Sequence, residues 1–302
     1  MLNRKTSLGM LIGSMVIFGT IGIFRRFIPV SSPMLAFVRG SLGAGFLMLI
    51  RLCQRYAQKR KETVSSPEQI SSDSQLSLWK KFIWFGIPGG MIGLNWVLLF
   101  EAYRYTSISV ATLCYYMAPT LVILCSPLVI GEKLTIKKLV CALTAVFGMV
   151  LISGIAGGEL VSFQGILLGL GAAALYAAVI LINKKAPDAD VYEKTMIQLG
   201  AAAIFLLPYL LLENSFSLKG LDPAGGFLLI VVGIVHTGVA YALYFGSIRS
   251  LKAQTVAILS YMDPVVALLL SWFILKEPFS VHSLLGAILI LGSTLISEFS
   301  FK

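Results

Sequence analysis

Apolar residues run along this chain in long stretches, separated by short segments rich in Gly, Pro, Lys, Ser and Asp. A helix that rises 1.5 Å per residue needs about 20 apolar residues to cross the roughly 30 Å hydrocarbon core of a bilayer. Stretches near this length predict ten helices, at residues 7–24, 33–50, 82–101, 107–130, 136–154, 163–182, 195–212, 225–245, 253–275 and 282–299. The predicted fold class is therefore an all-α polytopic membrane protein.

Composition supports the same class. Of the 302 residues, 57% are hydrophobic and only 13% are charged, outside the usual range of soluble domains. A net charge of +10 could indicate a nucleic-acid partner, but the Lys and Arg residues lie between apolar stretches instead of forming one patch. We expect a lipid bilayer around the protein and no nucleic acid. The polar residues 51–81 are predicted to form a flexible cytoplasmic loop.

The distribution of basic residues predicts the orientation in the membrane. Most of the 24 Lys and Arg residues fall in the N-terminal tail and in the loops after every second predicted helix. Loops rich in Lys and Arg stay on the cytoplasmic side, so both chain ends are predicted to be cytoplasmic. The first apolar stretch lacks the small-residue cleavage pattern of a signal peptide and is predicted to be retained. We expect a multi-pass protein of the plasma membrane.

Two parts of the chain repeat one pattern. "CYYMAPT" at residues 114–120 and "LSYMDPV" at residues 259–265 align without a gap, and the same shift superposes Arg104 on Arg249. We therefore predict two domains of five helices each.

The predicted domain boundaries are 1–154, which includes the loop at 51–81, and 155–302. Because five is odd, the second domain must enter the membrane from the opposite side, which gives an inverted repeat. Such repeats are typical of transporters that work by alternating access.

The repeated segments continue as "MAPTLVILCSPLVIGEKLT" and "MDPVVALLLSWFILKEPFS", each with a Glu near the helix end, Glu132 and Glu277. With two five-helix halves and cytoplasmic ends, the chain resembles the EamA-type drug/metabolite transporters over nearly its whole length. The resemblance implies secondary active transport of a small metabolite, with export of amino acids or amine-type metabolites favoured. For the two glutamates we expect interfacial ion pairs or loop hydrogen bonds.

Two prolines lie inside predicted helices, Pro119 in the fourth and Pro264 in the ninth. Each removes one backbone hydrogen bond and leaves the carbonyl four residues earlier, at Tyr115 or Ser260, without its helical donor. We predict that both act as hinges or line a cavity. The alternative is a role in packing alone.

Counting residues from the helix ends places Asp263 about 15 Å deep, near the bilayer midplane. Inverted-repeat transporters hold their substrate at this level. Placing a carboxylate inside the membrane costs free energy, and such residues usually mark functional sites. Asp263 is therefore predicted to contact the substrate or to carry a coupling proton. The alternative is a structural pair with His236 or Arg39. The counterpart of Asp263 in the first half is Ala118.

Other polar and aromatic groups predicted near this depth complete a candidate binding set. The predicted substrate-binding residues are Asp263, His236, Asn95, Tyr115, Tyr116, Tyr261, Tyr176, Trp96, Tyr241 and Arg39. His236 could relay protons with Asp263 or bond to a neighbouring helix. Arg39 could bind a substrate carboxylate, whereas the resemblance implies packing against helix-end carbonyls.

Several kinds of chemistry have no motif in this chain. The sequence contains no GxxxxGK[ST], HExxH or GxSxG, so ATP coupling, zinc hydrolysis and serine hydrolysis are not expected. The cysteines have no CxxC spacing and are predicted to be buried thiols: Cys53, Cys114, Cys125 and Cys141. We predict a secondary transporter of a small-molecule substrate, not an enzyme, with no cofactor or metal. Import, facilitated diffusion and a non-transporting membrane scaffold stay open as alternatives, and the sequence carries no signal for oligomeric state.

Overall fold

The computed structural model describes residues 3–62, 76–106, 108–153, 162–276 and 281–298, and these contain helices and no strand. The first half contains α1 (Arg4–Arg26), α2 (Ser32–Glu62), α3 (Leu78–Lys81), the π-helical η1 (Phe82–Gly86), α4 (Ile87–Tyr105), α5 (Ile108–Tyr115), α6 (Ala118–Ile130) and α7 (Ile136–Ser153). The second half contains α8 (Phe163–Lys185), α9 (Val191–Leu212), α10 (Pro223–Val231), the π-helical η3 (Val232–Val239), α11 (Ala240–Ile248), α12 (Ala253–Ser260), α13 (Met262–Leu275) and α14 (Val281–Glu298).

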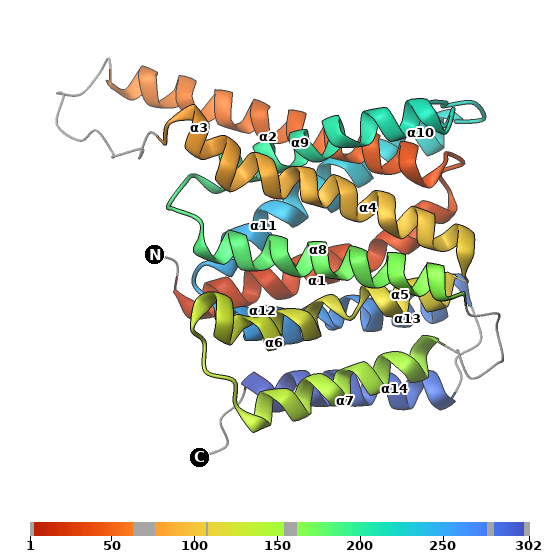
Figure 1. Cartoon of the computed structure of the whole chain (residues 1–302). Helices are drawn as coiled ribbons and strands as arrows, with labels where there is room; N and C mark the ends of the chain where they lie inside the picture. The colour runs from red at the N-terminus through yellow and green to blue at the C-terminus, as the bar shows by residue number, and fades with distance from the viewer. Residues whose placement is uncertain (1–2, 63–75, 107, 154–161, 277–280, 299–302) are drawn as a thin grey trace.

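The helices run side by side along a common direction (Figure 1). The start of α1 and the end of α14 lie at the same end of this bundle, on the left in the view. We call it the inner end and the opposite one the outer end. The two names describe position in the bundle only.

Each of the ten predicted segments is mainly helical where the structure describes it, but some bounds differ and two segments are interrupted. The second helix continues through Glu62, and Leu78–Lys81 form α3, so the prediction of a loop throughout residues 51–81 is wrong at both ends. The residues that follow the apolar part of α2 include Gln, Arg, Ala and Lys, which favour a helix in water as well as in lipid. Residues 63–75 lie outside the described part.

Eight of the described helical stretches are long and apolar enough to cross a membrane. Large apolar side chains on their outer surfaces point away from the protein core, among them Leu128, 89% exposed, and Ile204, 74% exposed. Water disfavours an apolar surface of this kind, whereas lipid matches it. The chain is a multi-pass integral membrane protein.

The fourth and ninth predicted helices are both interrupted. The fourth consists of α5 and α6, with a break at Tyr116 and Met117, and the ninth consists of α12 and α13, with a break at Tyr261. Pro119 and Pro264 follow these breaks by a few residues and cannot donate to the carbonyls one turn earlier. The breaks therefore lie beside the carbonyls that the prolines leave without a helical donor.

Packing between the helices follows a regular scheme. Helix α4 packs against α8 and α9, while η3 and α11 pack against α1 and η3 against α2. Glycines bring α4 close to α9: a Cβ at Gly89 would lie 2.5 Å from the carbonyl oxygen of Gln198, and one at Gly93 would lie 2.8 Å from that of Ala202. Helices α7 and α14 pair at one edge of the bundle (Figure 1).

All four cysteines are free thiols, but the prediction that all are buried is wrong. Cys141 is buried, Cys114 and Cys125 are half-buried, and Cys53 is exposed. Cys53 lies on the polar extension of α2, where the helix has left the apolar stretch.

Candidate functional site

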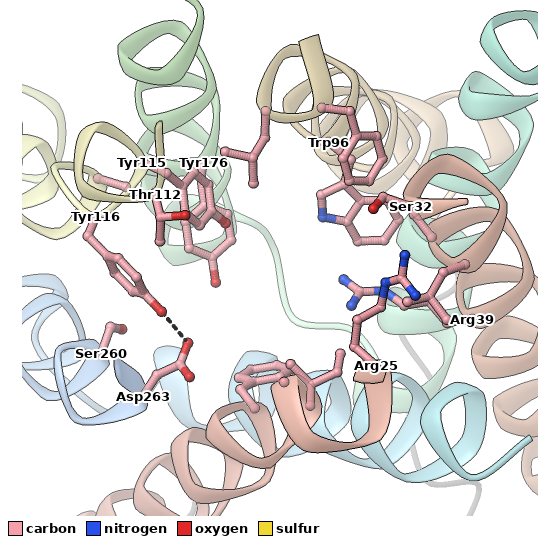
Figure 2. A pocket seen from close by; sticks show the side chains of 18 of the residues that line it. Arg25, Ser32, Arg39, Trp96, Thr112, Tyr115, Tyr116, Tyr176, Ser260 and Asp263 are labelled. Atoms are coloured by element: carbon pink, nitrogen blue, oxygen red, sulfur yellow. Dashed lines mark hydrogen bonds between the residues drawn. The ribbon is translucent and has the colours of Figure 1, made fainter. Parts of the chain in front are cut away.

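A cavity of about 390 Å³ lies among α1, α2, α4, α5, α6, α8, α11, α12 and α13 (Figure 2). Its lining reaches Arg25 near the end of α1 and Ser32 at the start of α2, both at the outer end. It extends inward to Tyr241 and to Ser260, which are buried. Its volume is in the range of small-molecule binding sites.

One wall of the cavity is acidic. Asp263 lies in the first turn of α13, directly after the break at Tyr261, and its side chain faces the cavity. The Tyr116 hydroxyl donates a hydrogen bond to Asp263 Oδ2 across 3.2 Å (Figure 2). The two helix breaks thus place a carboxylate and its hydrogen-bond donor at the same wall.

The opposite wall is basic. Arg39 of α2 and Arg25 of α1 point into the cavity from the side that faces Asp263 (Figure 2). The Arg39 guanidinium carbon lies 4.7 Å from the centre of the Trp96 ring, and Arg25 donates to the carbonyl of Ile28 at 2.6 Å. Among the described residues, no carboxylate lies within ion-pair distance of Arg39. Its charge is therefore available to a ligand.

Aromatic rings line much of the space between these walls. The rings of Tyr115 and Tyr176 lie 5.8 Å apart, and those of Phe18 and Tyr241 lie 5.1 Å apart. Phe100 adds a further apolar surface. The cavity therefore joins two sites of opposite charge across an apolar middle.

The structure brings most of the predicted substrate-binding residues to the cavity. Those that line it are Asp263, Arg39, Trp96, Tyr115, Tyr116, Tyr176 and Tyr241, together with the predicted hinge residue Pro119. The predicted residues His236, Asn95, Tyr261 and Pro264 are not part of the lining.

Three of the predicted residues outside the lining bond to neighbouring helices instead. His236 Nε2 lies 2.7 Å from Thr20 Oγ1, so of the two alternatives for His236 this structure contains the bond to a neighbouring helix. Asn95 donates to the Ala172 carbonyl at 2.5 Å. The Tyr261 hydroxyl lies 2.7 Å from Thr120 Oγ1. Counting from helix ends gives the depth of these residues but not the side of the helix on which each one lies.

Arg25 lines the cavity but was not among the predicted substrate-binding residues, because a charge at a helix end is ordinary in membrane proteins. A signal was nevertheless present. Phe18, Ile21, Gly22 and Arg25 recur at helical spacing, and all four line the cavity. Arg25 therefore lies on the same face of α1 as residues deeper in the cavity.

Several hydrogen bonds at the inner end converge on the segment that joins α11 and α12. The Lys184 ammonium donates to the carbonyls of Ile248, Arg249 and Leu251. Oxygens of Glu132 accept from the backbone N–H of Ala253 at 2.8 Å and of Gln254 at 3.3 Å. Glu132 thus makes loop hydrogen bonds, as predicted, whereas Glu277 lies outside the described residues.

The comparisons with known proteins agree with this architecture. The model of the EamA-like transporter family matches residues 5–154 and, a second time, residues 163–299. The chain belongs to the EamA-like transporter family. The two matched segments together cover almost the whole chain.

Relatives of this EamA-like transporter carry related names. A Bacillus subtilis (strain 168) protein named uncharacterized transporter YxxF is 28% identical over 290 residues, covering 95% of this chain and 88% of the relative. An Escherichia coli (strain K12) protein named probable amino-acid metabolite efflux pump is 28% identical over 228 residues, covering 72% of this chain and 70% of the relative. A solved crystal structure with a TM-score of 0.78 and 18% identity covers 98% of this chain and 97% of its own, which shows the shared fold.

Proposed function

We propose that this EamA-like transporter exports an amino acid or a related amine-bearing metabolite. The observation that carries the proposal is the placement of Asp263 and Arg39 on opposite walls of one cavity. A carboxylate binds a substrate ammonium group, and a guanidinium binds a substrate carboxylate. A zwitterion therefore matches the cavity at both ends, and the aromatic middle suits an apolar side chain. The name of the Escherichia coli relative supports this substrate class and the direction.

Alternating access is the proposed mechanism. The family model matches each half of the chain separately, and the packing of α4 on α8 and α9 has a counterpart in the packing of η3 on α1 and α2. Both findings support ten membrane helices arranged as two inverted repeats of five. In such a protein, exchanging the conformations of the two halves moves the opening from one side of the membrane to the other.

The conformation described is proposed to be the outward-facing one. The lining of the cavity reaches the outer end, while Lys184 and Glu132 close the inner end. The positive-inside rule assigns the inner end, and with it both chain ends, to the cytoplasm. The plasma membrane is the proposed location.

Proton exchange is part of the proposal. Asp263 faces a cavity within the membrane, where a carboxylate can hold either a proton or a substrate ammonium group but not both. Binding of one would displace the other. This competition would couple outward movement of substrate to inward movement of protons.

A counterflow assay in proteoliposomes tests the function. The vesicles are loaded in turn with each proteinogenic L-amino acid, with phenethylamine, which lacks a carboxylate, and with 3-phenylpropionate, which lacks an ammonium group. Accumulation of the same labelled compound is then followed. We expect saturable exchange of at least one zwitterion, abolished in Asp263→Asn, a variant of nearly equal side-chain volume. Exchange at the rate of protein-free vesicles for every compound would reject the proposed function.

A further inference from the structure

Lys194 is a buried cation that the outward-facing cavity does not use. It lies in the first turn of α9 and is only 8% exposed. Nearby carboxylates bind other cations: Asp190 and Glu193 pair with Arg51 at 2.8 and 3.1 Å, and Glu193 also pairs with Lys81 at 2.5 Å. Among the described residues, no carboxylate lies within ion-pair distance of Lys194. Burying an ammonium group without a counter-ion lowers the stability of the folded protein. A lysine at such a position therefore suggests a functional role.

Aromatic rings separate Lys194 from the cavity. The ammonium lies 5.5 Å from the centre of the Phe245 ring, a contact that offers it partial electrostatic compensation. The Phe245 ring lies 5.5 Å from that of Tyr241, which lines the cavity. Arg39 thus lies on the cavity side of this ring layer, and Lys194 lies behind it.

The crossing of α2 and α9 relates the two cations through the repeat. A Cβ at Gly40 would lie 3.6 Å from both the carbonyl oxygen of Leu199 and the Cβ of Ala203, so α2 and α9 cross near these residues. A shift of 159 residues superposes the start of α2 at Ser32 on the start of α9 at Val191 and pairs Gly40 with Leu199. In this register, Lys194 of α9 corresponds to Leu35 of α2.

Phe245, which contacts Lys194, also has a counterpart in the first half of the chain. The shift that superposes Arg104 on Arg249 pairs Phe100 with Phe245. Leu35 and Phe100 both line the outer cavity. If the halves exchange conformations, the positions that correspond to them, Lys194 and Phe245, line the cavity that opens at the inner end.

We propose that Lys194 binds the carboxylate of the substrate in the inward-facing state, in the place of Arg39 in the outward-facing state. This inference rests on the proposed function, because it requires alternating access. The bond is a charge-assisted hydrogen bond from the ammonium to the carboxylate, and no covalent bond changes. The substrate class is thereby narrowed to metabolites that carry an anionic group as well as an amine.

The first test measures the accessibility of Lys194 and does not depend on the substrate. In a background in which Cys53, Cys114, Cys125 and Cys141 are replaced by Ser, Lys194→Cys is treated with the membrane-impermeant reagent 2-sulfonatoethyl methanethiosulfonate. We expect modification from the inner side and none from the outer side. Arg39→Cys should show the opposite sidedness, and Lys185→Cys, at an exposed position on the last turn of α8, reports full access from the inner side. A Lys194→Cys protein that is unreactive from both sides, or reactive from the outer side, would overturn the inference.

The second test measures the contact between the Lys194 ammonium and the substrate carboxylate. The probes are L-phenylalanine, which carries a carboxylate, and phenethylamine, which does not. Lys194→Met should raise the inner-side KM for L-phenylalanine about tenfold relative to the outer-side KM, the size expected for loss of one hydrogen bond to a charged group. The ratio for phenethylamine should not change, and Lys194→Arg should restore the ratio for L-phenylalanine. Lys185→Met is the control for loss of an exposed lysine. An equal effect of Lys194→Met on both probes would exclude a contact with the carboxylate.

The two tests separate this inference from the proposed function. If the wild type carries neither probe, the proposed function fails for these substrates, and the cysteine labelling still decides whether Lys194 faces an inner cavity. If the wild type carries L-phenylalanine but Lys194→Cys is unreactive, transport stands and the inference is rejected.

Discussion

Tyr116 and Asp263 face each other across the two helix breaks, with the tyrosine hydroxyl donating to the aspartate carboxylate over 3.2 Å. Tyr116 lies at the break between α5 and α6, and Asp263 lies just after the break between α12 and α13. Both line the cavity. The hydrogen bond therefore joins the two halves at the group that we propose to recognise the substrate amine.

Removing the Tyr116 hydroxyl should weaken substrate binding without abolishing it. A hydrogen bond contributes roughly 0.5–1.5 kcal/mol net, so Tyr116→Phe should raise the KM for a zwitterionic substrate about two- to tenfold in the counterflow assay. Tyr105→Phe, at an exposed position at the end of α4, is the matched control. An unchanged KM in Tyr116→Phe would show that the aspartate is oriented by other groups.

Arg39 should distinguish zwitterions from simple amines. Loss of a hydrogen bond to a charged group costs roughly 1.5–3 kcal/mol, so Arg39→Met should weaken binding of L-phenylalanine by about ten- to a hundredfold. Binding of phenethylamine should change little, because it has no carboxylate. Arg39→Lys keeps the charge but loses the planar fork, so it should give an intermediate affinity. Isothermal titration in detergent measures all three proteins, and an equal loss for both ligands would point to a structural role of Arg39.

The prolines should influence turnover more than binding. Pro119→Ala and Pro264→Ala each restore a backbone donor for the carbonyl one turn earlier, at Tyr115 or Ser260. A more continuous helix should hinder exchange between the two conformations, so we expect a lower kcat with a nearly unchanged dissociation constant. Pro208→Ala, inside α9 and away from both breaks, is the control. A fall in affinity with an unchanged kcat would instead indicate that the prolines shape the binding cavity.

The hydrogen bonds of Glu132 should hold the inner end closed. Glu132→Ala leaves the backbone N–H groups of Ala253 and Gln254 without their carboxylate acceptor. We expect the free energy of unfolding to fall by about 1–3 kcal/mol, and Glu132→Gln, which keeps one acceptor oxygen, to lose less. Titration of the purified protein with sodium dodecyl sulfate measures both variants. Equal stability of wild type and Glu132→Ala would mean that other contacts close the inner end.

The positions of the helices could be predicted from the sequence, because lipid demands a nearly continuous apolar stretch for each crossing. The end of α2 could not be predicted in this way, because residues 51–62 form a helix through local propensity and not through hydropathy. Both helix breaks lie close before a proline, because the missing N–H is a property of the residue itself, whereas the predicted hinge role of Pro119 and Pro264 stays a prediction.

The candidate site was less predictable than the fold. Depth follows from residue counts, and it placed Asp263 and Tyr116 at one level. The direction in which a side chain points depends on how the helices rotate against one another, which no count supplies. His236 therefore bonds to Thr20 instead of Asp263, and Asn95 bonds to the backbone of α8.

Recognition of both ends of a zwitterion can be tested in one binding experiment. Thermal stabilisation of the purified protein is measured with L-phenylalanine, phenethylamine and 3-phenylpropionate, for the wild type, Asp263→Asn and Arg39→Met. A ligand at about 100 times its dissociation constant stabilises a protein by roughly 2.7 kcal/mol when it binds only the folded state. We predict that L-phenylalanine stabilises the wild type most and that each variant loses most of this effect. Equal stabilisation of the wild type and both variants by L-phenylalanine would show that Asp263 and Arg39 do not bind the two ends of the ligand.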